Sequence, residues 1–343
     1  MTESRYHQLA INFVKTNLLS WSEANEENTS ITLLTGNSNK VFLVETSLDV
    51  YPNKIIYRIF GPNEITDKNR ERKIFSKLSH ESLGPKNLGD SSTERLEQYF
   101  EGYEPLNYSL FTNSSIIKKI CKKLKKLHSL DMSEVLLDEP LMTDENPKKW
   151  RDIIISKKDY FNSLPEWSFV QELVSQSSLD MYNDVLPRSS KVVFSHLDPS
   201  PINFLYNESN KKVLFINYEF SGFSFRSMDM GLMLSEMQLD YFYDKPPYYK
   251  FHPEYAPSDE LIKEYVLAYG EGKDMWIEVK RTLIATHYLW AVWSLAMYNG
   301  PTEGYNCLAF SMLKFNVFKN LYSEYIEQGG EATLLKFSEE LFN

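Results

Sequence analysis

The sequence predicts an α+β protein with two parts, and three observations support this. Short runs of β-branched and aromatic residues, bounded by Gly, Asn and Pro, dominate the first hundred residues and are typical of strands. From about residue 112 onward, apolar residues recur mainly at helical spacing. Glycine, proline and asparagine punctuate residues 101–113, which favours a hinge or linker there. The predicted parts are therefore residues 1–100 and 114–343.

The first part contains four predicted strands and one helix. The strands are residues 31–34, 41–45, 54–60 and 96–100. The helix covers residues 67–78, because Ile74, Phe75 and Leu78 share one face and charged residues occupy the others. Asp67 is the expected N-cap, since its side chain can accept hydrogen bonds from the first free backbone N–H groups of the helix.

The second part is helical except for a strand, loop and hairpin at residues 191–217. The helix predicted at residues 114–128 carries six lysines beside an apolar face. The apolar face consists of Ile116, Ile117, Ile120, Cys121, Leu124 and Leu127. A membrane-surface helix is one interpretation. A core-facing helix with a solvated lysine face is favoured, because the protein is acidic overall and lysine stems readily cover apolar surface.

Length and composition exclude several classes of protein. The 343 residues, 42% of them apolar and 14% aromatic, suffice for a packed core in one large or two modest domains. A net charge of −10 argues against a nucleic-acid partner, which requires clustered cations. Cys121 and Cys307 lack metal-type spacing and are expected to be free thiols in a reducing compartment. We expect a cytoplasmic protein, because the N-terminus lacks an apolar signal core and no window is apolar enough to insert into a membrane.

A chemical motif lies at residues 194–204, which read Phe-Ser-His-Leu-Asp-Pro-Ser-Pro-Ile-Asn-Phe. Phosphoryl transfer of the kinase type needs an Asp that orients and deprotonates the acceptor hydroxyl, an Asn five residues later that holds Mg²⁺, and a second metal ligand after the next strand. Asp198 and Asn203 match the first two positions, and Asn217 stands at the third, where an Asp is usual. His196 is expected to brace the backbone, so the general base is assigned to Asp198.

Asn217 is the weak point of this predicted site. It can offer a carbonyl oxygen to Mg²⁺, but it lacks the charge that attracts a hard cation. Glu219 lies two residues further on, so its side chain shares a face with Asn217 if the strand continues, and it could then share the metal. Three hypotheses stay open: a weakened natural enzyme, a ligand-binding pseudoenzyme, and an engineered Asp→Asn inactivation.

Together these motifs resemble the choline/ethanolamine kinase family from about residue 30 to 320. Residues 82–86 and 95–99 are also similar to the family's pattern that leads into the adenine hinge. The resemblance implies the two-lobed protein-kinase-like fold, with a small antiparallel-sheet N-lobe and a larger, mainly helical C-lobe. It also implies ATP and Mg²⁺ as cofactors, with Glu97 and Tyr99 near the adenine.

The resemblance extends to the residues that hold the nucleotide phosphates. Residues 35–39 resemble the family's phosphate loop, usually Gly-Gly-x-Ser-Asn, although an ordinary hairpin turn is the favoured interpretation of this pentapeptide taken alone. The nucleotide-binding residues that it implies are Gly36, Ser38 and Asn39. Arg58 is the expected cation for the phosphates, and Glu71 is expected to pair with it as the orienting carboxylate.

An aromatic pair suggests the phosphate acceptor. Trp290 and Trp293 are one helical turn apart and match a Trp-x-x-Trp of the family's choline pocket, although such a pair on an apolar helix taken alone indicates core packing. A quaternary ammonium donates no hydrogen bond and is held by π faces and carboxylates. The resemblance implies that Phe220 and Tyr241 complete the cage and that Glu236 supplies negative charge.

The resemblance therefore predicts a choline kinase, which transfers the γ-phosphate of ATP to choline and yields phosphocholine for phosphatidylcholine synthesis. Residues 235–245 look like the choline branch, whose members carry Asp-Tyr-x-Tyr-x-Lys at this point. The alternatives are an ethanolamine kinase, a catalytically impaired pseudokinase and an aminoglycoside-type phosphotransferase. The resemblance also implies a homodimer, and no membrane insertion is expected.

Overall fold

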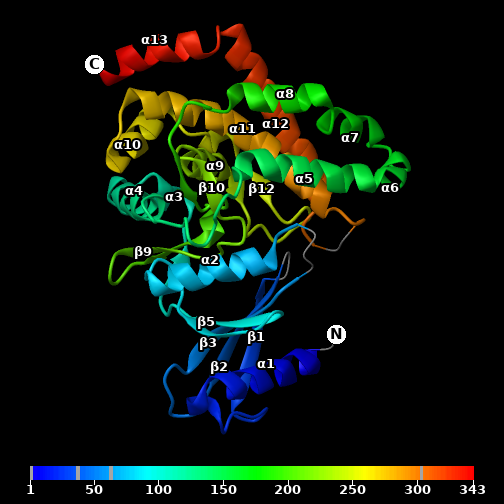
Figure 1. The fold of residues 1–343 in the computed structure, drawn as a ribbon, viewed down its shortest axis with the longest axis vertical. Helices are drawn as coiled ribbons and strands as arrows, with labels where there is room; N and C mark the ends of the chain where they lie inside the picture. Colours follow the sequence, from blue (N-terminus) through cyan, green and yellow to red (C-terminus); the bar gives the residue numbers. More distant parts are fainter. Residues whose placement is uncertain (1–2, 36–38, 62–64, 302–303) are drawn as a thin grey trace. The chain divides into compact units, whose positions relative to one another are not determined.

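The chain forms two compact units in the computed structural model, Met1–Tyr103 (unit 1) and Glu104–Asn343 (unit 2) (Figure 1). The division lies inside the segment 101–113 that the sequence predicts as a linker. The residues that the structure describes are 3–35, 39–61, 65–301 and 304–343.

Unit 1 is built on one antiparallel sheet of five strands in the order β1-β2-β3-β5-β4. The strands are β1 Thr29–Thr35, β2 Lys40–Thr46, β3 Lys54–Ile59, β4 Asn87–Asp90 and β5 Glu94–Gln98. The four strands predicted from the sequence correspond to β1, β2, β3 and β5. The prediction missed β4, because its residues Asn-Leu-Gly-Asp have low strand propensity and pairing with β5 holds them extended.

The two faces of this sheet differ in chemistry because strand side chains alternate. One face is apolar, and helix α1, Glu3–Asn17, covers it with Ala10 and Val14. Helix α2, Lys68–His80, lies on the opposite face (Figure 1). The apolar cluster comprises Ala10, Val14, Trp21, Ala24, Phe42, Val44, Ile55, Tyr57 and Leu96. The sequence did not predict α1, whose apolar residues are interspersed with polar ones.

The α2 helix confirms the prediction for residues 67–78. Asp67 is its N-cap, and its Oδ1 accepts hydrogen bonds from the backbone N–H of Asn69 and Arg70, both at 3.0 Å. Ile74, Phe75 and Leu78 are buried, as the periodicity predicts.

Unit 2 is mainly helical. Its α-helices are α3 Tyr108–Phe111, α4 Ser114–His128, α5 Met142–Ser156, α6 Lys158–Asn162, α7 Trp167–Leu173, α8 Gln176–Val185, α9 Met228–Glu236, α10 Asp259–Tyr269, α11 Lys273–Met297, α12 Cys307–Glu327 and α13 Glu331–Phe342. Its strands are β6 Glu104–Pro105, β7 Val192–Ser195, β8 Phe204–Asn207, β9 Lys212–Phe215, β10 Gly222–Phe225, β11 Leu239–Asp240 and β12 Lys250–Phe251. Single 3₁₀ turns are η1 Leu19–Trp21 in unit 1, and η2 Pro201–Asn203 and η3 Pro253–Tyr255 in unit 2.

Helix α11 forms the core of unit 2. It packs against α5, α8, α9, α10, α12 and α13. Most of its residues are buried, as expected for a helix that has no charged residue after Arg281. Two short strand pairs, β7 with β10 and β8 with β9, lie beside the helices and carry the loops of the candidate site.

The lysine-rich helix α4 has the bounds that the sequence predicts. Asn113 caps its N-terminus, and all six apolar residues on one face are buried against α10, β7 and β9. The lysines lie on the other face, so the core-facing interpretation is confirmed. Within the described ranges, no helix is both long and apolar enough to cross a membrane.

Candidate active site

Two strand pairs bring the predicted catalytic residues of unit 2 together. In the β8–β9 hairpin, Phe204 lies opposite Phe215, and their rings stack with centroids 4.1 Å apart. This pairing places Asn203, just before β8, beside Ile216, whose backbone N–H donates to the Asn203 carbonyl at 3.0 Å. Asn217 follows directly. One hairpin therefore brings Asn203 and Asn217, which are far apart in the motif, close together in space.

Asp198 accepts hydrogen bonds from both amides. Asn203 Nδ2 lies 2.7 Å from Asp198 Oδ2, and Asn217 Nδ2 lies 3.4 Å from the same oxygen. The Oδ1 atoms of Asn203 and Asn217 receive no hydrogen bond from the part of the chain that the structure describes. Both amide oxygens are thus available as ligands.

The negative charges around Asp198 make its ionised form costly. Burial raises the pKa of Asp198 well above its usual range, and the nearby carboxylates of Glu219 and Glu236 raise it further. Hydrogen bonds from Asn203 and Ser200 oppose this effect only in part. A raised pKa brings a carboxylate closer to the value that suits a general base at neutral pH.

His196 braces the loop that carries Asp198. Its Nδ1 accepts from the backbone N–H of Asp198 at 3.2 Å, so Nε2 carries the proton and donates to the carbonyl of Ile216 at 2.9 Å. Burial lowers the pKa of His196, which keeps the ring neutral. The imidazole thereby ties the loop before β8 to the segment after β9.

A buried carboxylate that the sequence analysis missed holds the same loop. Asp229, on α9, accepts from the backbone N–H of His196 and of Leu197, each at 2.7 Å, and lies 3.0 Å from Nε2 of His128. Burial tends to raise the pKa of Asp229, but the His128 bond and the surrounding charges and N–H groups lower it overall. An Asp near the start of a largely apolar helix was the available signal, because a buried charge needs a specific partner.

The strand does not continue to Glu219, so the condition for Glu219 to share a face with Asn217 is not met. Strand β9 ends at Phe215, and Asn217 adopts the left-handed conformation with φ of 64°, which asparagine tolerates better than most residues. Alternation of side chains therefore does not place Glu219 on the face of Asn217. Glu219 is buried, and the turn after β9 leaves its carboxylate close enough to Asp198 for the two charges to repel.

This group of oxygen atoms fits a hard divalent cation. The amide oxygens of Asn203 and Asn217 are available, and the mutual repulsion of Asp198 and Glu219 is relieved by positive charge. Outside this mixed amide and carboxylate set, the described residues contain no cluster of three His, Cys, Asp or Glu side chains arranged for a metal. Because Asn217 replaces the Asp that is usual at this position, the site has one negative charge fewer and attracts a cation less strongly.

Three aromatic rings meet as the Trp-x-x-Trp pattern predicts. Trp290 and Trp293 have ring centroids 5.2 Å apart at 78°, and Phe220 meets them edge-on at 5.9 and 6.2 Å. Trp150 of α5, which the sequence analysis missed, meets Phe220 at 6.0 Å and 83°. Ser221 Oγ donates to the His196 carbonyl at 3.0 Å, so Phe220 is tied to the loop of Asp198.

Glu236, which the resemblance expects to supply negative charge, is paired within the protein. Lys314 of α12 is fully buried, and its Nζ lies 2.6 Å from Glu236 Oε1. The Tyr241 hydroxyl donates to Oε2. Glu236 and Tyr241 do lie together, but Lys314 already neutralises the carboxylate.

In unit 1, the expected pairing of Arg58 with Glu71 is wrong. Arg95 binds Glu71 through two nitrogens, each at 2.8 Å. Arg58 Nε instead binds Glu97 at 2.6 Å, and Arg95 contacts the same carboxylate at 2.9 Å. Arg58 and Arg95 lie opposite one another on β3 and β5, so Glu97 bridges two cations. Burial tends to raise the pKa of Glu97, but the two guanidinium groups lower it to about 2.

The other predicted nucleotide residues are placed in part. Asn39 is buried, and its Oδ1 accepts from the Gly61 backbone and from Lys68 Nζ, both at 3.0 Å, so it braces the chain after β3. Tyr99 is half-buried directly after β5. Gly36 and Ser38 lie outside the described residues.

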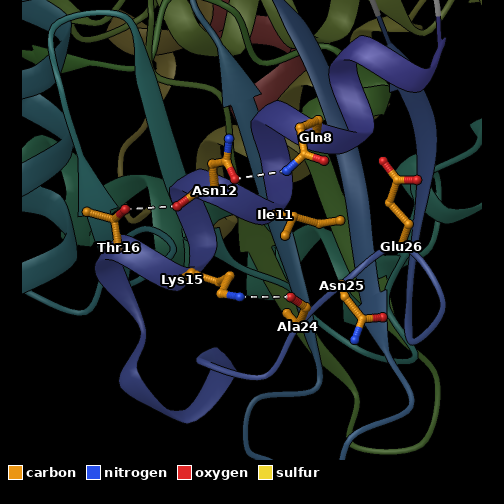
Figure 2. A pocket seen from close by; sticks show the side chains of 8 residues that line it. All are labelled: Gln8, Ile11, Asn12, Lys15, Thr16, Ala24, Asn25 and Glu26. Carbon is orange, nitrogen blue, oxygen red and sulfur yellow. Dashed lines mark hydrogen bonds between the residues drawn. The ribbon is translucent and has the colours of Figure 1, made fainter.

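Separate hollows are present in each unit, and no predicted site residue lines either of them. Figure 2 shows one of about 480 Å³ beside α1 in unit 1. Its lining groups largely bond to the chain itself, as in the contacts of Gln8 with Asn12 and of Lys15 with the Ala24 carbonyl. A second, of about 290 Å³, lies in unit 2 beside Tyr182 and Arg188.

A family model described as choline/ethanolamine kinase matches residues 31–319. The chain belongs to this family. Members of the choline/ethanolamine kinase family are kinases that act on choline or ethanolamine.

Individual relatives agree with the family match. A choline/ethanolamine kinase of Rattus norvegicus is 24% identical over 341 residues, which cover 91% of this chain and 84% of the relative. A choline kinase of Cryptosporidium parvum has a TM-score of 0.76 at 22% identity, covering 98% of this chain and 100% of that one. An ethanolamine kinase of Plasmodium vivax has a TM-score of 0.72 at 18% identity, covering 93% and 91%. The protein-kinase-like fold predicted from the sequence is thereby confirmed, while both substrates occur among the relatives.

Proposed function

We propose that this member of the family is a choline kinase, which transfers the γ-phosphate of ATP to the hydroxyl of choline. The observation that carries the proposal is the aromatic cluster of Phe220, Trp290 and Trp293, held next to the loop of Asp198 through Ser221. Ring faces bind a methylated ammonium without hydrogen bonds. The same unit therefore supplies a cation pocket and a general base.

Asp198 orients the choline hydroxyl and takes its proton as the oxygen bonds to the γ-phosphorus of ATP, while the bond from that phosphorus to the bridging oxygen of the β-phosphate breaks and ADP leaves. Its raised pKa favours this role. Asn203 and Asn217 would hold Mg²⁺ through their free amide oxygens, and the ion would neutralise phosphate charge. Arg58 of unit 1 contributes a cation toward the nucleotide phosphates. Its Nη1 makes no hydrogen bond to any residue that the structure describes, whereas its Nε donates a hydrogen bond to Glu97.

The nucleotide contacts of unit 1 are part of the same proposal. Gly36, Ser38 and Asn39 provide the phosphate loop by family resemblance, and Tyr99 lies next to the adenine. Glu97 and Glu71 act less directly, because both carboxylates are taken by guanidinium groups. They hold Arg58 and Arg95 in place.

Trp290→Ala is expected to raise the KM for choline by about tenfold or more and to leave the KM for ATP nearly unchanged, given about 1 to 2 kcal/mol for a desolvated cation–π contact. The measurement is steady-state kinetics with each substrate varied. Trp276→Ala is the matched control, because Trp276 lies on the same helix but packs against Phe337 of α13. A parallel loss of affinity for choline and ATP in Trp290→Ala would indicate a structural tryptophan.

Asn217→Asp is expected to increase choline-dependent ADP formation at limiting Mg²⁺ much more than at saturating Mg²⁺. A carboxylate adds charge attraction for a hard dication, and such a ligand chiefly affects occupancy when the metal is scarce. The measurement is a Mg²⁺ titration of both forms. Superimposable titrations would mean that Glu219 or another group already supplies the missing charge.

Two alternatives within the family are tested by the same assays. Preference for ethanolamine over choline in kcat/KM would identify an ethanolamine kinase. Binding of choline without ADP release would identify a pseudokinase, for which the neutral Asn217 is the motivating observation. The homodimer, the cytoplasmic location and the role in phosphatidylcholine synthesis stay predictions from the family resemblance.

A further inference from the structure

We infer that Lys314 sets the acceptor preference of this site by occupying Glu236, so that a methylated ammonium binds better than a primary one. The inference rests on the proposed function, since it concerns the same pocket. Lys314 acts here as a positioning residue, because it works through the carboxylate and need not touch the substrate.

Each oxygen of Glu236 already has a hydrogen-bond partner within the protein. Lys314 Nζ binds Oε1 at 2.6 Å, and the Tyr241 hydroxyl donates to Oε2. Glu236 is 2% exposed and Lys314 is fully buried, so neither group can turn to water. A buried lysine without its carboxylate carries a large desolvation cost, which makes this pair a permanent part of the pocket.

The Glu236–Lys314 pair lies near Asp198, whose carboxylate repels Glu236. His287 lies on α11 one turn before Trp290, and burial, reinforced by the charge of Lys314, lowers its pKa well below the usual range, so the ring is neutral. Burial and the charge of Glu236 raise the pKa of Tyr305, and Tyr305 hydrogen-bonds to Ser294, the residue after Trp293. The ion pair and the aromatic rings thus belong to one neighbourhood.

The unpartnered polar atoms of the three tryptophans in this neighbourhood are donors. The indole Nε1 atoms of Trp150, Trp290 and Trp293 are buried and have no acceptor among the residues that the structure describes. Asp198 Oδ2 is already bonded to Asn203 and Asn217. Donors do not satisfy an ammonium.

A primary ammonium and a quaternary ammonium meet this pocket differently. The primary ion has three N–H groups, each of which loses a water acceptor on entry and needs a protein acceptor in exchange. The quaternary ion has none and is attracted by ring faces alone. Because Lys314 and Tyr241 occupy both oxygens of Glu236, discrimination arises from unsatisfied N–H groups, which give sharper selectivity than fit alone.

The test compares Lys314→Met with the double variant Lys314→Met/Glu236→Gln. Binding of tetramethylammonium and of methylammonium is measured by tryptophan fluorescence, and kcat/KM is measured for choline and ethanolamine. In the wild-type protein we expect tetramethylammonium to bind at least tenfold more tightly than methylammonium. In Lys314→Met the free Oε1 accepts an N–H, so that ratio should fall at least fivefold. In the double variant the ratio should return toward the wild-type value.

Tyr241→Phe is a second variant, in case Lys314→Met does not fold. It frees Oε2 without removing a charge, and a shift of a few-fold in the same direction is expected. An unchanged ratio in either folded variant, or a double variant that resembles Lys314→Met, would overturn the inference. Equal binding of the two ammonium ions to the wild-type protein would also overturn it. Discriminating binding without turnover would overturn the proposed function alone.

Discussion

Asp198→Asn is expected to lower choline-dependent phosphate transfer by about 10²- to 10⁴-fold, the usual contribution of a general base, and to raise the melting temperature in the same variant. The amide cannot take a proton from the hydroxyl but can still accept from Asn203. Its neutral group also removes the repulsion from Glu219 and Glu236.

The gain in stability has a definite sign. The folded-state pKa of Asp198 lies above its unfolded value, so the unfolded chain ionises first as the pH rises, and stability falls through that window. The melting temperatures of the two forms are therefore expected to be equal below about pH 4 and to diverge as the pH approaches neutrality, in buffer without divalent cations.

Asp152→Asn is the control, because this Asp is exposed on α5. It should alter neither activity nor melting temperature. The wild-type kcat/KM should also begin to fall on the acid side at a pH above the ordinary pKa of an aspartate. Substantial turnover by Asp198→Asn would remove Asp198 from the role of base, and a lower melting temperature would contradict the electrostatic account.

Asp229→Ala is expected to destabilise the protein by about 3 to 5 kcal/mol and to abolish transfer, because it breaks a buried network. The substitution leaves the backbone N–H groups of His196 and Leu197 without their acceptor. It also removes the hydrogen-bond partner of His128 Nε2. The loop of Asp198 then loses its anchor. Urea unfolding followed by fluorescence measures the first effect, and ADP release measures the second.

The pH dependence of this variant runs opposite to that of Asp198. The folded-state pKa of Asp229 is lowered, so its contribution is present above the unfolded value and is lost as the pH falls through the folded one. The difference in unfolding free energy should be constant near neutrality and shrink below about pH 4. Asp144→Ala, which removes a largely solvated pair with Arg188, should cost no more than about 1 kcal/mol. A similar cost for both variants would contradict the anchoring role of Asp229.

Much of the fold could be predicted from local patterns. The strands β2 and β3 follow from β-branched residues bounded by turn residues, and α4 follows from a clean apolar face with an asparagine cap. These signals are strong because each depends on residues close together in the chain. Strand β4 lacks such a signal, since only pairing with β5 makes it extended.

For the candidate site, the sequence by itself determined which residues are proposed to carry the chemistry: Asp198 and Asn203 by their spacing, and Trp290 and Trp293 by one helical turn. The tertiary structure alone decided which partners the buried charged groups of unit 1 and unit 2 take. Arg95 reaches Glu71 across 24 residues, Asp229 reaches the His196 loop across 33, and Lys314 reaches Glu236 across 78. A buried charge takes whichever partner the packing brings within hydrogen-bond distance, and no local pattern encodes that choice.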